Sequence, residues 1–166
     1  MERSAEISPC GRYRYLLRRT WDRDCTHALF VMLNPSTADA EIDDATIRSC
    51  IRLSRSWGHG GFEVINLFGW RATDPAELAA TADPIGPGNA YAVETSISRC
   101  AVVIYAWGAS RFVTRDSTEG LSSLVRFYHR TPFCLGTTKS GAPKHPLYIK
   151  SGTPLTVYRL SRPVLP

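Results

Sequence analysis

The stretch ALFVML at residues 28–33 decides the fold. It is a run of six apolar side chains, which is typical of a strand that is buried on both faces of a parallel sheet. Two largely apolar runs follow it, FEVINL at residues 62–67 and AVVIYAW at residues 101–107. We therefore expect all three runs to be strands of one central sheet.

Helical patterns lie between these strands. In residues 46–57 apolar side chains recur at helical spacing, Asp43 or Asp44 is placed to cap the first turn, and Gly58 is placed to end the last turn. Other segments also show residues suited to a first helical turn or apolar residues at helical spacing. We expect further helices at residues 75–80, 89–99 and 117–129, and further strands at residues 13–19 and 132–135.

The alternation of strands and helices is the pattern of an α/β domain with a parallel sheet. Right-handed crossovers place helices on both faces of such a sheet. We expect a three-layer α/β/α fold around a central, mostly parallel four-stranded sheet, with the N-terminal segment adding an antiparallel edge strand. No linker or repeat interrupts residues 1–166, which predicts a single domain. We expect residues 151–166 to form a tail that wraps the surface, with a strand at residues 155–160.

The charge of the chain is carried almost wholly by arginine. Lys and Arg number 20 against 15 Asp and Glu, which gives a net charge of +5 and a pI near 9.1. The lysines are Lys139, Lys144 and Lys150 alone. Arginine binds phosphate through two parallel hydrogen bonds, so the excess points to a nucleotide or nucleic-acid partner. Codon bias in a GC-rich genome would produce the same excess, and both explanations stay open.

Composition also excludes several classes of protein. The hydrophobic share of 43% and the charged share of 21% are not those of a disordered or fibrous chain. No apolar run is long enough to cross a bilayer and the N-terminus has no signal-type segment, so we expect a cytoplasmic protein without membrane contact. The 5 cysteines are widely spaced with no CxxC pair, which predicts free thiols and argues against a zinc site. We expect no metal and no cofactor.

Ligands of open α/β sheets bind at the carboxyl ends of the strands, so the segments that follow the strands form the candidate site. Residues 34–39, 66–75, 108–111 and 136–146 supply amides, hydroxyls, cations and aromatic rings. This mixture suits a flat polar ligand with a phosphate nearby, and we expect the four segments to line one cleft. The candidate binding residues are Pro35, Ser36, Asn66, Phe68, Arg71, Trp107, Arg111, Lys139 and Lys144.

His145 is the candidate for proton transfer in these segments. It lies between Lys144 and Pro146, and a histidine beside a cation can donate to an oxyanion or a leaving group. Structural explanations stay open for the neighbouring candidates. Asn34 precedes a proline and can simply form a turn, while Trp107 can fill the core.

The same segments resemble a known family. The chain is similar, over residues 12–150 and in unbroken order, to the bacterial and phage family catalogued as domain of unknown function 1643. The resemblance covers nearly the whole chain and implies no particular activity. The runs that carry it are VMLNPSTAD at residues 31–39, NLF at 66–68, RATDP at 71–75, DPIGPGN at 83–89, AWG at 106–108 and TKSGAPKHPLY at 138–148.

A more distant resemblance suggests a chemistry. LNPS at residues 33–36 is similar to the Asn-Pro motif of the mismatch-specific branches of the uracil-DNA glycosylase superfamily. VIN at residues 64–66 resembles that superfamily's strand with a terminal base-reading asparagine, and HPL at residues 145–147 resembles its late His-Pro motif. The resemblance implies hydrolysis of the N-glycosidic bond of a modified or mismatched base. It assigns Asn34 and His145 as catalytic residues, to position a water and to stabilise the departing base, and Asn66 as the reader of a base edge.

Two departures from the superfamily pattern widen the range of substrates. Met32 stands where the superfamily has a glycine. The loop after the late histidine reads Leu147-Tyr148-Ile149 in place of the usual duplex wedge, and Tyr148 can stack on a base without wedging. Flipping a base out of a duplex costs a few kcal/mol. The sequence therefore favours duplex DNA as a substrate no more than a free nucleotide, a nucleoside or a single strand.

Three functions follow from these observations. The first is an enzyme that handles nucleobases or nucleotides, a hydrolase similar to the N-glycosylases, and base release from uracil-containing or mismatched DNA would test it. The second is a non-catalytic binder of nucleic acid or nucleotides, in which Arg48, Arg52 and Arg55 contact phosphates and salt weakens binding steeply. The third is a protein-interaction module, favoured if the chain's own side chains fill the strand-end cleft. The oligomeric state stays open.

Overall fold

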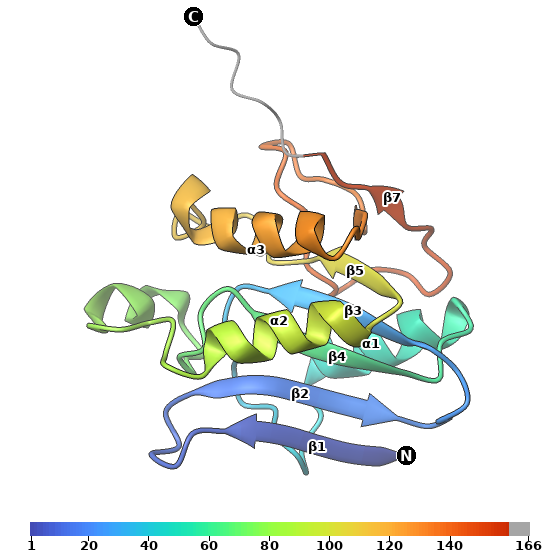
Figure 1. Ribbon diagram of the computed structural model, residues 1–166, viewed down its shortest axis with the longest axis horizontal. Coiled ribbons are helices and arrows are strands. Elements are labelled where there is room, and N and C mark those ends of the chain that lie inside the picture. The colour runs from blue at the N-terminus through green and yellow to red at the C-terminus, as the bar shows by residue number, and fades with distance from the viewer. Residues whose placement is uncertain (160–166) are drawn as a thin grey trace, which may run out of the picture.

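A seven-stranded mixed sheet forms the middle of the molecule in residues 1–159, the part of the chain that this computed structural model describes (Figure 1). Three α-helices and one 3-10 helix, η1, accompany it within these residues. Along the chain the elements are β1 (Glu2–Ile7), β2 (Arg14–Thr20), β3 (His27–Met32), α1 (Ala45–Ser56), β4 (Gly61–Asn66), η1 (Pro75–Ala80), α2 (Asn89–Arg99), β5 (Val102–Tyr105), α3 (Arg115–Phe127), β6 (Pro132–Cys134) and β7 (Thr156–Val157).

The strands lie in the order β1-β2-β4-β3-β5-β6-β7. β4, β3, β5 and β6 are parallel, which confirms the predicted parallel core, while β1, β2 and β7 join antiparallel. The prediction of a four-stranded sheet is wrong in the number of strands. β1 was not predicted because its sequence, ERSAEI, is exposed and has no apolar alternation, so backbone pairing with β2 defines it.

Helices cover both faces of the sheet. Ile47 and Leu53 of α1 pack with Phe30 of β3 on one face, whereas Ile97 of α2 and Leu121 of α3 belong to the core on the other face. Figure 1 shows α2 and α3 on the near side of the sheet and α1 behind it. The fold is therefore α/β with the sheet between two helical layers.

The four predicted helices are all present, with ends shifted by at most two residues. α1 begins where the sequence predicts, because the side chain of its N-cap Asp44 accepts a hydrogen bond of 2.8 Å from the backbone N–H of Ile47. None of the helices in residues 1–159 is long and apolar enough to cross a membrane.

The connections reverse direction beside β3, and this reversal positions the site. The link through α1 leads from β3 to β4 on one side, and the link through α2 then returns across β3 to β5 on the other side. The loops that leave β3 and β5 therefore diverge at the carboxyl ends of the strands. Such a point is where open α/β sheets usually offer a ligand crevice.

A β-bulge turns Arg14 toward the α1 face. Leu16 pairs with Glu6 and Arg14 with Ile7, so Tyr15 is the extra residue of β2. The Tyr15 ring packs so closely on Gly88 that a Cβ there would lie 2.6 Å from it. The Arg14 side chain donates a hydrogen bond to the backbone carbonyl of Ala38, and Ala38 belongs to the core between the sheet and α1.

The segment after β6 enters the core before the described chain ends. The strand predicted at residues 155–160 is β7, and it spans only Thr156–Val157. The predicted surface tail lies partly outside the description, because residues 160–166 are not among the described residues. Tyr158 is only 9% exposed and packs in the core beneath α2 and α3.

Candidate functional site

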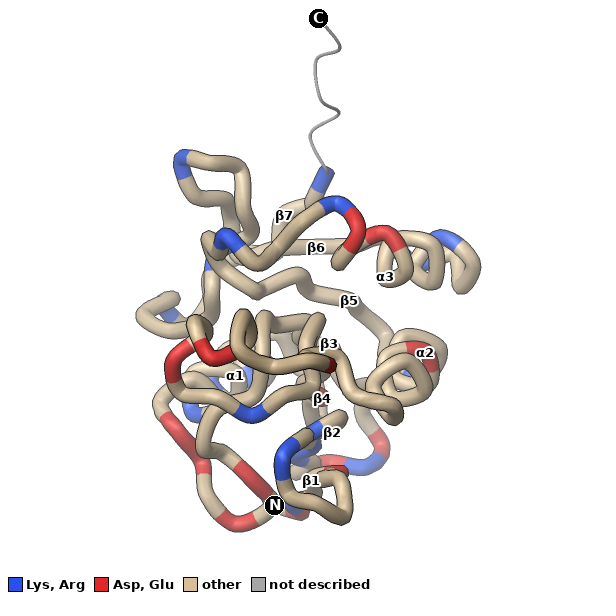
Figure 2. Tube along the Cα trace, turned by 90° about the vertical axis from the view of Figure 1, so that its left-hand side faces the viewer, with Lys and Arg blue, Asp and Glu red and all other residues tan. Residues whose placement is uncertain are grey.

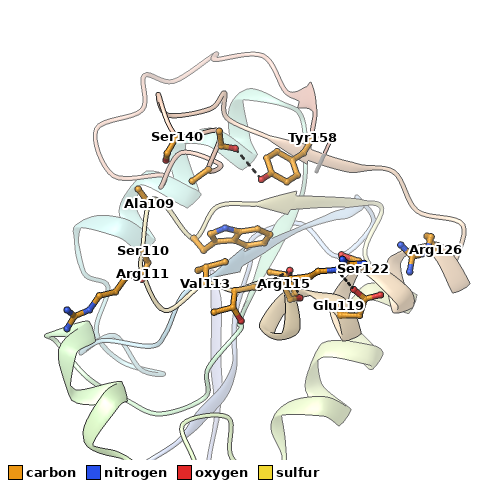
Figure 3. A pocket seen from close by; sticks show the side chains of 16 residues that line it. Ala109, Ser110, Arg111, Val113, Arg115, Glu119, Ser122, Arg126, Ser140 and Tyr158 are labelled. Carbon is orange, nitrogen blue, oxygen red and sulfur yellow. Dashed lines mark hydrogen bonds and ion pairs between the residues drawn. The ribbon is translucent and has the colours of Figure 1, made fainter. Parts of the chain in front are cut away.

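A cavity of about 970 Å³ opens beside the start of α3 (Figure 3). Three parts of the chain line it: residues 107–111 after β5, the side of α3, and residues 140–142 together with Tyr158. Its volume is at the upper end of the range of about 300 to 1,000 Å³ that is typical of small-molecule sites. We call it the α3 cavity.

Two aromatic residues form part of its wall. The rings of Trp107 and Tyr158 meet edge to face with centroids 6.1 Å apart, and Tyr105 lies behind them at 4.6 Å from Trp107. The Tyr158 hydroxyl donates a hydrogen bond of 3.2 Å to the backbone carbonyl of Gly141, which fixes the segment opposite α3. Burial raises the pKa of Tyr158, and it raises the pKa of Tyr105 to about 12, so both phenols are neutral at neutral pH.

The rest of the lining is polar and carries more positive than negative charge. Arg111, Arg115 and Arg126 line the cavity together with the single carboxylate of Glu119. Arg115 pairs with Glu119 at 3.6 Å, whereas Arg126 donates to the hydroxyl of Ser123 at 3.1 Å. Figure 3 shows Arg111 and Arg126 at opposite ends of the cavity. Two guanidinium groups without a carboxylate partner among residues 1–159 therefore flank it.

The first turn of α3 borders the same space. Thr114 caps the helix by accepting a hydrogen bond of 3.2 Å from the backbone N–H of Ser117, and the Ser117 hydroxyl in turn accepts one of 2.9 Å from the N–H of Thr114. Further along α3, Ser122 is about nine-tenths buried and its hydroxyl has no hydrogen-bond partner among the described residues. A helix N-terminus favours an anion, so the first turn of α3 suits a negatively charged group in the cavity.

The loops after β3 and β4 line a second, smaller hollow of about 370 Å³. Arg71 spans one side of it by donating to the Gly11 carbonyl at 3.3 Å, and the Arg12 guanidinium lies 6.0 Å from the centre of the Trp70 ring. The four segments that follow the strands thus divide between two hollows instead of lining one cleft. The residues that line the smaller hollow are Gly11, Arg12, Ser36, Thr37, Trp70, Arg71, Ala72, Thr73 and Glu77.

Neither hollow is lined by Asn34, Asn66 or His145. The Asn34 amide joins the loop after β3 to the loop after β4, because it donates to the Ala72 carbonyl at 2.9 Å and to the Pro35 carbonyl at 3.1 Å. This is the turn-forming role that the sequence left open for Asn34.

Asn66 and His145 lie on the α1 face of the sheet. Asn66 is 1% exposed, and both its side-chain nitrogen and its oxygen lack a partner among the described residues. The Nδ1 of His145 accepts a hydrogen bond of 3.3 Å from the Leu147 N–H. Burial lowers the pKa of His145, against a smaller upward effect of the Asp44 carboxylate, so the imidazole is neutral at neutral pH.

The other predicted residues fall into separate places. Trp107 and Arg111 line the α3 cavity, Ser36 and Arg71 line the second hollow, and Pro35 and Phe68 are buried. Lys139, Lys144 and Tyr148 are exposed on the surface. Within residues 1–159 no group of three or more His, Cys, Asp or Glu side chains is arranged to hold a metal ion.

The sequence did not point to the α3 residues of the cavity or to Tyr158. Arg115 and Arg126 are outward positions of an amphipathic helix, and such positions are usually solvated. Tyr158, the one aromatic residue in the sequence of the tail at residues 151–166, is the signal that could have been followed, because large aromatic side chains are usually buried.

Comparison with known proteins gives one match. No curated protein matches the chain, and no solved structure matches it. The family model described as protein of unknown function (DUF1643) matches residues 14–147. Because this match spans most of the sequence, the chain belongs to the DUF1643 family.

Proposed function

We propose that the protein binds a nucleotide in the α3 cavity. The observation that carries this proposal is the combination, in one space of about 970 Å³, of the Trp107–Tyr158 wall with Arg111 and Arg126 at the two ends. A nucleotide joins a flat aromatic base to a phosphate. An aromatic wall and guanidinium groups are the two kinds of contact that such a ligand needs.

The charges of the cavity favour phosphate over a neutral ligand. Glu119 is the only carboxylate of the lining, and Arg115 already pairs with it at 3.6 Å. The first turn of α3 adds the positive end of a helix dipole to the two remaining arginines. The hydroxyls of Ser110 and Ser140 also line the cavity. Ser110 accepts from the Phe112 N–H at 3.2 Å and Ser140 bonds to the Thr138 hydroxyl at 2.9 Å, so each can form one further hydrogen bond to the sugar or to the edge of the base.

Isothermal titration calorimetry with the four nucleoside 5′-monophosphates tests the proposal, with the four nucleosides as ligands that lack phosphate. We expect at least one nucleotide to bind and its nucleoside to bind much more weakly. The double substitution Arg111→Gln/Arg126→Gln should weaken binding about tenfold or more, since each hydrogen bond to a charged group contributes about 1.5 to 3 kcal/mol. The control is Arg23→Gln, which changes an exposed residue outside the lining of the cavity and should leave the affinity for the nucleotide unchanged. Absence of binding by every nucleotide would contradict the proposal.

A second candidate function, hydrolysis of an N-glycosidic bond, is favoured by the unpaired carboxamide of Asn66. A buried amide whose donor and acceptor both lack partners can pair with the edge of a nucleobase. In this reaction water adds to C1′ of the sugar, the bond from C1′ to the base nitrogen breaks, and the base leaves with a proton. The neutral imidazole of His145 would stabilise the departing base by donating a hydrogen bond.

Base release from a uracil-containing single-stranded oligonucleotide tests this second function. Activity in the parent protein that is lost in Asn66→Ala and in His145→Ala, with circular dichroism spectra unchanged, would support it. If a correctly folded parent protein releases no base from uracil-containing, mismatched or modified substrates, the hydrolase proposal fails while nucleotide binding in the α3 cavity is unaffected.

A further inference from the structure

A loop near the C-terminus runs along the outer side of α1. The Ser49 hydroxyl near the start of the helix donates to the Pro146 carbonyl at 2.8 Å. At the end of the helix the Gly152 N–H donates to the Ser56 hydroxyl at 3.1 Å, and the Trp57 indole N–H donates to the Thr153 carbonyl at 2.9 Å. These three bonds hold residues 146–153 alongside α1 from Ser49 to its C-terminal end.

The surface made by α1 and this loop is positively charged. Arg48, Arg52 and Arg55 are exposed on α1, and Lys150 is exposed on the loop. None of the four has a carboxylate partner among residues 1–159. The loop is also free of acidic residues, because no Asp or Glu occurs between residues 120 and 159, a region drawn in Figure 2 with blue and tan segments only.

Arg52 connects the two halves of this surface. It donates a hydrogen bond of 3.2 Å to the Ser49 hydroxyl, the same hydroxyl that holds the Pro146 carbonyl. Its guanidinium therefore lies beside the loop. Arg55 continues the row at the far end of the helix, where it lies 5.0 Å from the centre of the Trp21 ring.

Tyr148 projects from the loop into solvent. It is 90% exposed, the highest value among the exposed large hydrophobic residues, and its φ angle of 68° is rare for a residue with a side chain. The neighbouring Ile149 packs against the core, and its N–H donates to the Pro146 carbonyl at 3.1 Å. The tight turn between Pro146 and Ile149 thus holds an aromatic ring outward, two residues after the Pro146 carbonyl that Ser49 of α1 holds.

We infer that this surface, made of Arg48, Arg52, Arg55, Tyr148 and Lys150, binds single-stranded nucleic acid. Cations in a row can track the phosphates of a strand, and an exposed ring can stack on an unpaired base. A duplex offers phosphates but keeps its base faces covered, so the exposed Tyr148 favours a single strand. The inference concerns a different surface from the α3 cavity and stands whether or not that cavity binds a nucleotide.

Fluorescence anisotropy with a labelled 20-nucleotide oligo(dT) strand, measured from 50 to 300 mM salt, tests the inference. The double substitution Arg52→Gln/Lys150→Gln should weaken binding and should reduce the slope of log K against log salt by about 1.4, because each lost phosphate contact on a single strand removes about 0.7. Arg12→Gln/Arg23→Gln removes the same charge from the turns at either end of β2, outside the proposed surface, and should leave the slope unchanged.

Substitutions of Tyr148 separate base stacking from charge. Tyr148→Gly removes the ring and suits the positive φ angle, so the loop should keep its shape while affinity falls about fivefold or more. Tyr148→Phe keeps the ring and should bind as the parent does. The inference is overturned if the strand does not bind at 50 mM salt, if the two double variants behave alike, or if duplex binds as tightly as single strand and Tyr148→Gly has no effect.

Discussion

Trp107 and Tyr158 meet edge to face, with ring centroids 6.1 Å apart and ring planes at 82°. They lie 51 positions apart in the chain, Trp107 two residues after the end of β5 and Tyr158 directly after β7. Their contact closes one side of the α3 cavity and ties the end of the described chain to the centre of the sheet. The ring of Tyr158 is therefore both part of the proposed site and part of the core.

Substitutions of Tyr158 should separate the contribution of its ring to stability from that of its hydroxyl. Tyr158→Ala should lower the free energy of unfolding by about 3 kcal/mol, the lower end of the range for removal of a buried aromatic side chain. Tyr158→Phe loses only the hydrogen bond to the Gly141 carbonyl and should cost about 1 kcal/mol. Urea denaturation followed by circular dichroism measures both. Equal losses for the two variants would show that the ring adds no packing energy.

A second prediction concerns the loop before α1. Arg19 is fully buried and pairs with Asp43 at 2.8 Å, while a further nitrogen donates to the Asp39 carbonyl at 2.6 Å. Arg19→Met should destabilise the fold by about 3 kcal/mol, because it leaves the mostly buried Asp43 carboxylate with only its second pair, to the partly exposed Arg3 at 3.2 Å.

Hydrogen exchange would show whether the loop itself depends on Arg19. We expect faster amide exchange across residues 39–44 in Arg19→Met than in the parent. The exposed pair of Arg23 with Glu2 provides a matched control, since Arg23→Met should cost less than about 1 kcal/mol. Unchanged exchange in Arg19→Met would contradict the anchoring role.

Glu63 should make stability sensitive to acid. This carboxylate is 1% exposed in β4 and pairs with Arg99 at 2.7 Å and with Arg18 at 2.9 Å. Burial raises the pKa of Glu63, but the hydrogen bonds and positive charges around it outweigh burial, so its pKa is lowered below the ordinary value of 4.5. A lowered pKa stabilises the folded state above pH 4.5, and this contribution is lost as the pH falls through the folded-state value.

The measurement is the free energy of unfolding between pH 7 and pH 3 for the parent and for Glu63→Gln. We expect the substitution to destabilise the protein at pH 7 by about 3 kcal/mol, because it leaves two arginines without their shared partner. The difference between the two proteins should shrink as the pH falls below 4.5. A difference that is independent of pH would contradict an ionised Glu63.

His145 should titrate below its ordinary value of 6.5, because burial disfavours the imidazolium form. The unfolded chain then binds more protons in mildly acidic solution, so His145 makes the folded state less stable as the pH falls below 6.5 and has no effect on stability well above that pH. NMR of the imidazole resonances gives the pKa of His145 directly. The assignment is confirmed by the missing signal in His145→Gln, and a pKa above 6.5 would contradict the buried, neutral state.

The parallel core could be predicted from the sequence because its strands are short and largely apolar runs. ALFVML at β3 needs both helical layers to cover it, which fixed the fold class. β1 could not be predicted, since an edge strand with charged side chains is defined by backbone hydrogen bonds to β2.

The site was predicted only in part, for a physical reason. Sequence order places Trp107 and Arg111 after β5, where the α3 cavity lies, but it does not show which loop closes on them. Tyr158 reaches the cavity through pairing of β7 with β6, a contact between segments that neither composition nor periodicity encodes. Asn34 has the position expected of a site residue, yet its amide is used to join two loops.

The most direct test of nucleotide binding in the α3 cavity is an NMR titration of the ¹⁵N-labelled protein with a nucleoside 5′-monophosphate. We expect shift changes to concentrate at the Trp107 indole N–H, at the amides of residues 114–118 around the first turn of α3, and at residues 140–142. Saturation without shifts at these positions, or no shifts at any nucleotide concentration that the protein tolerates, would contradict it.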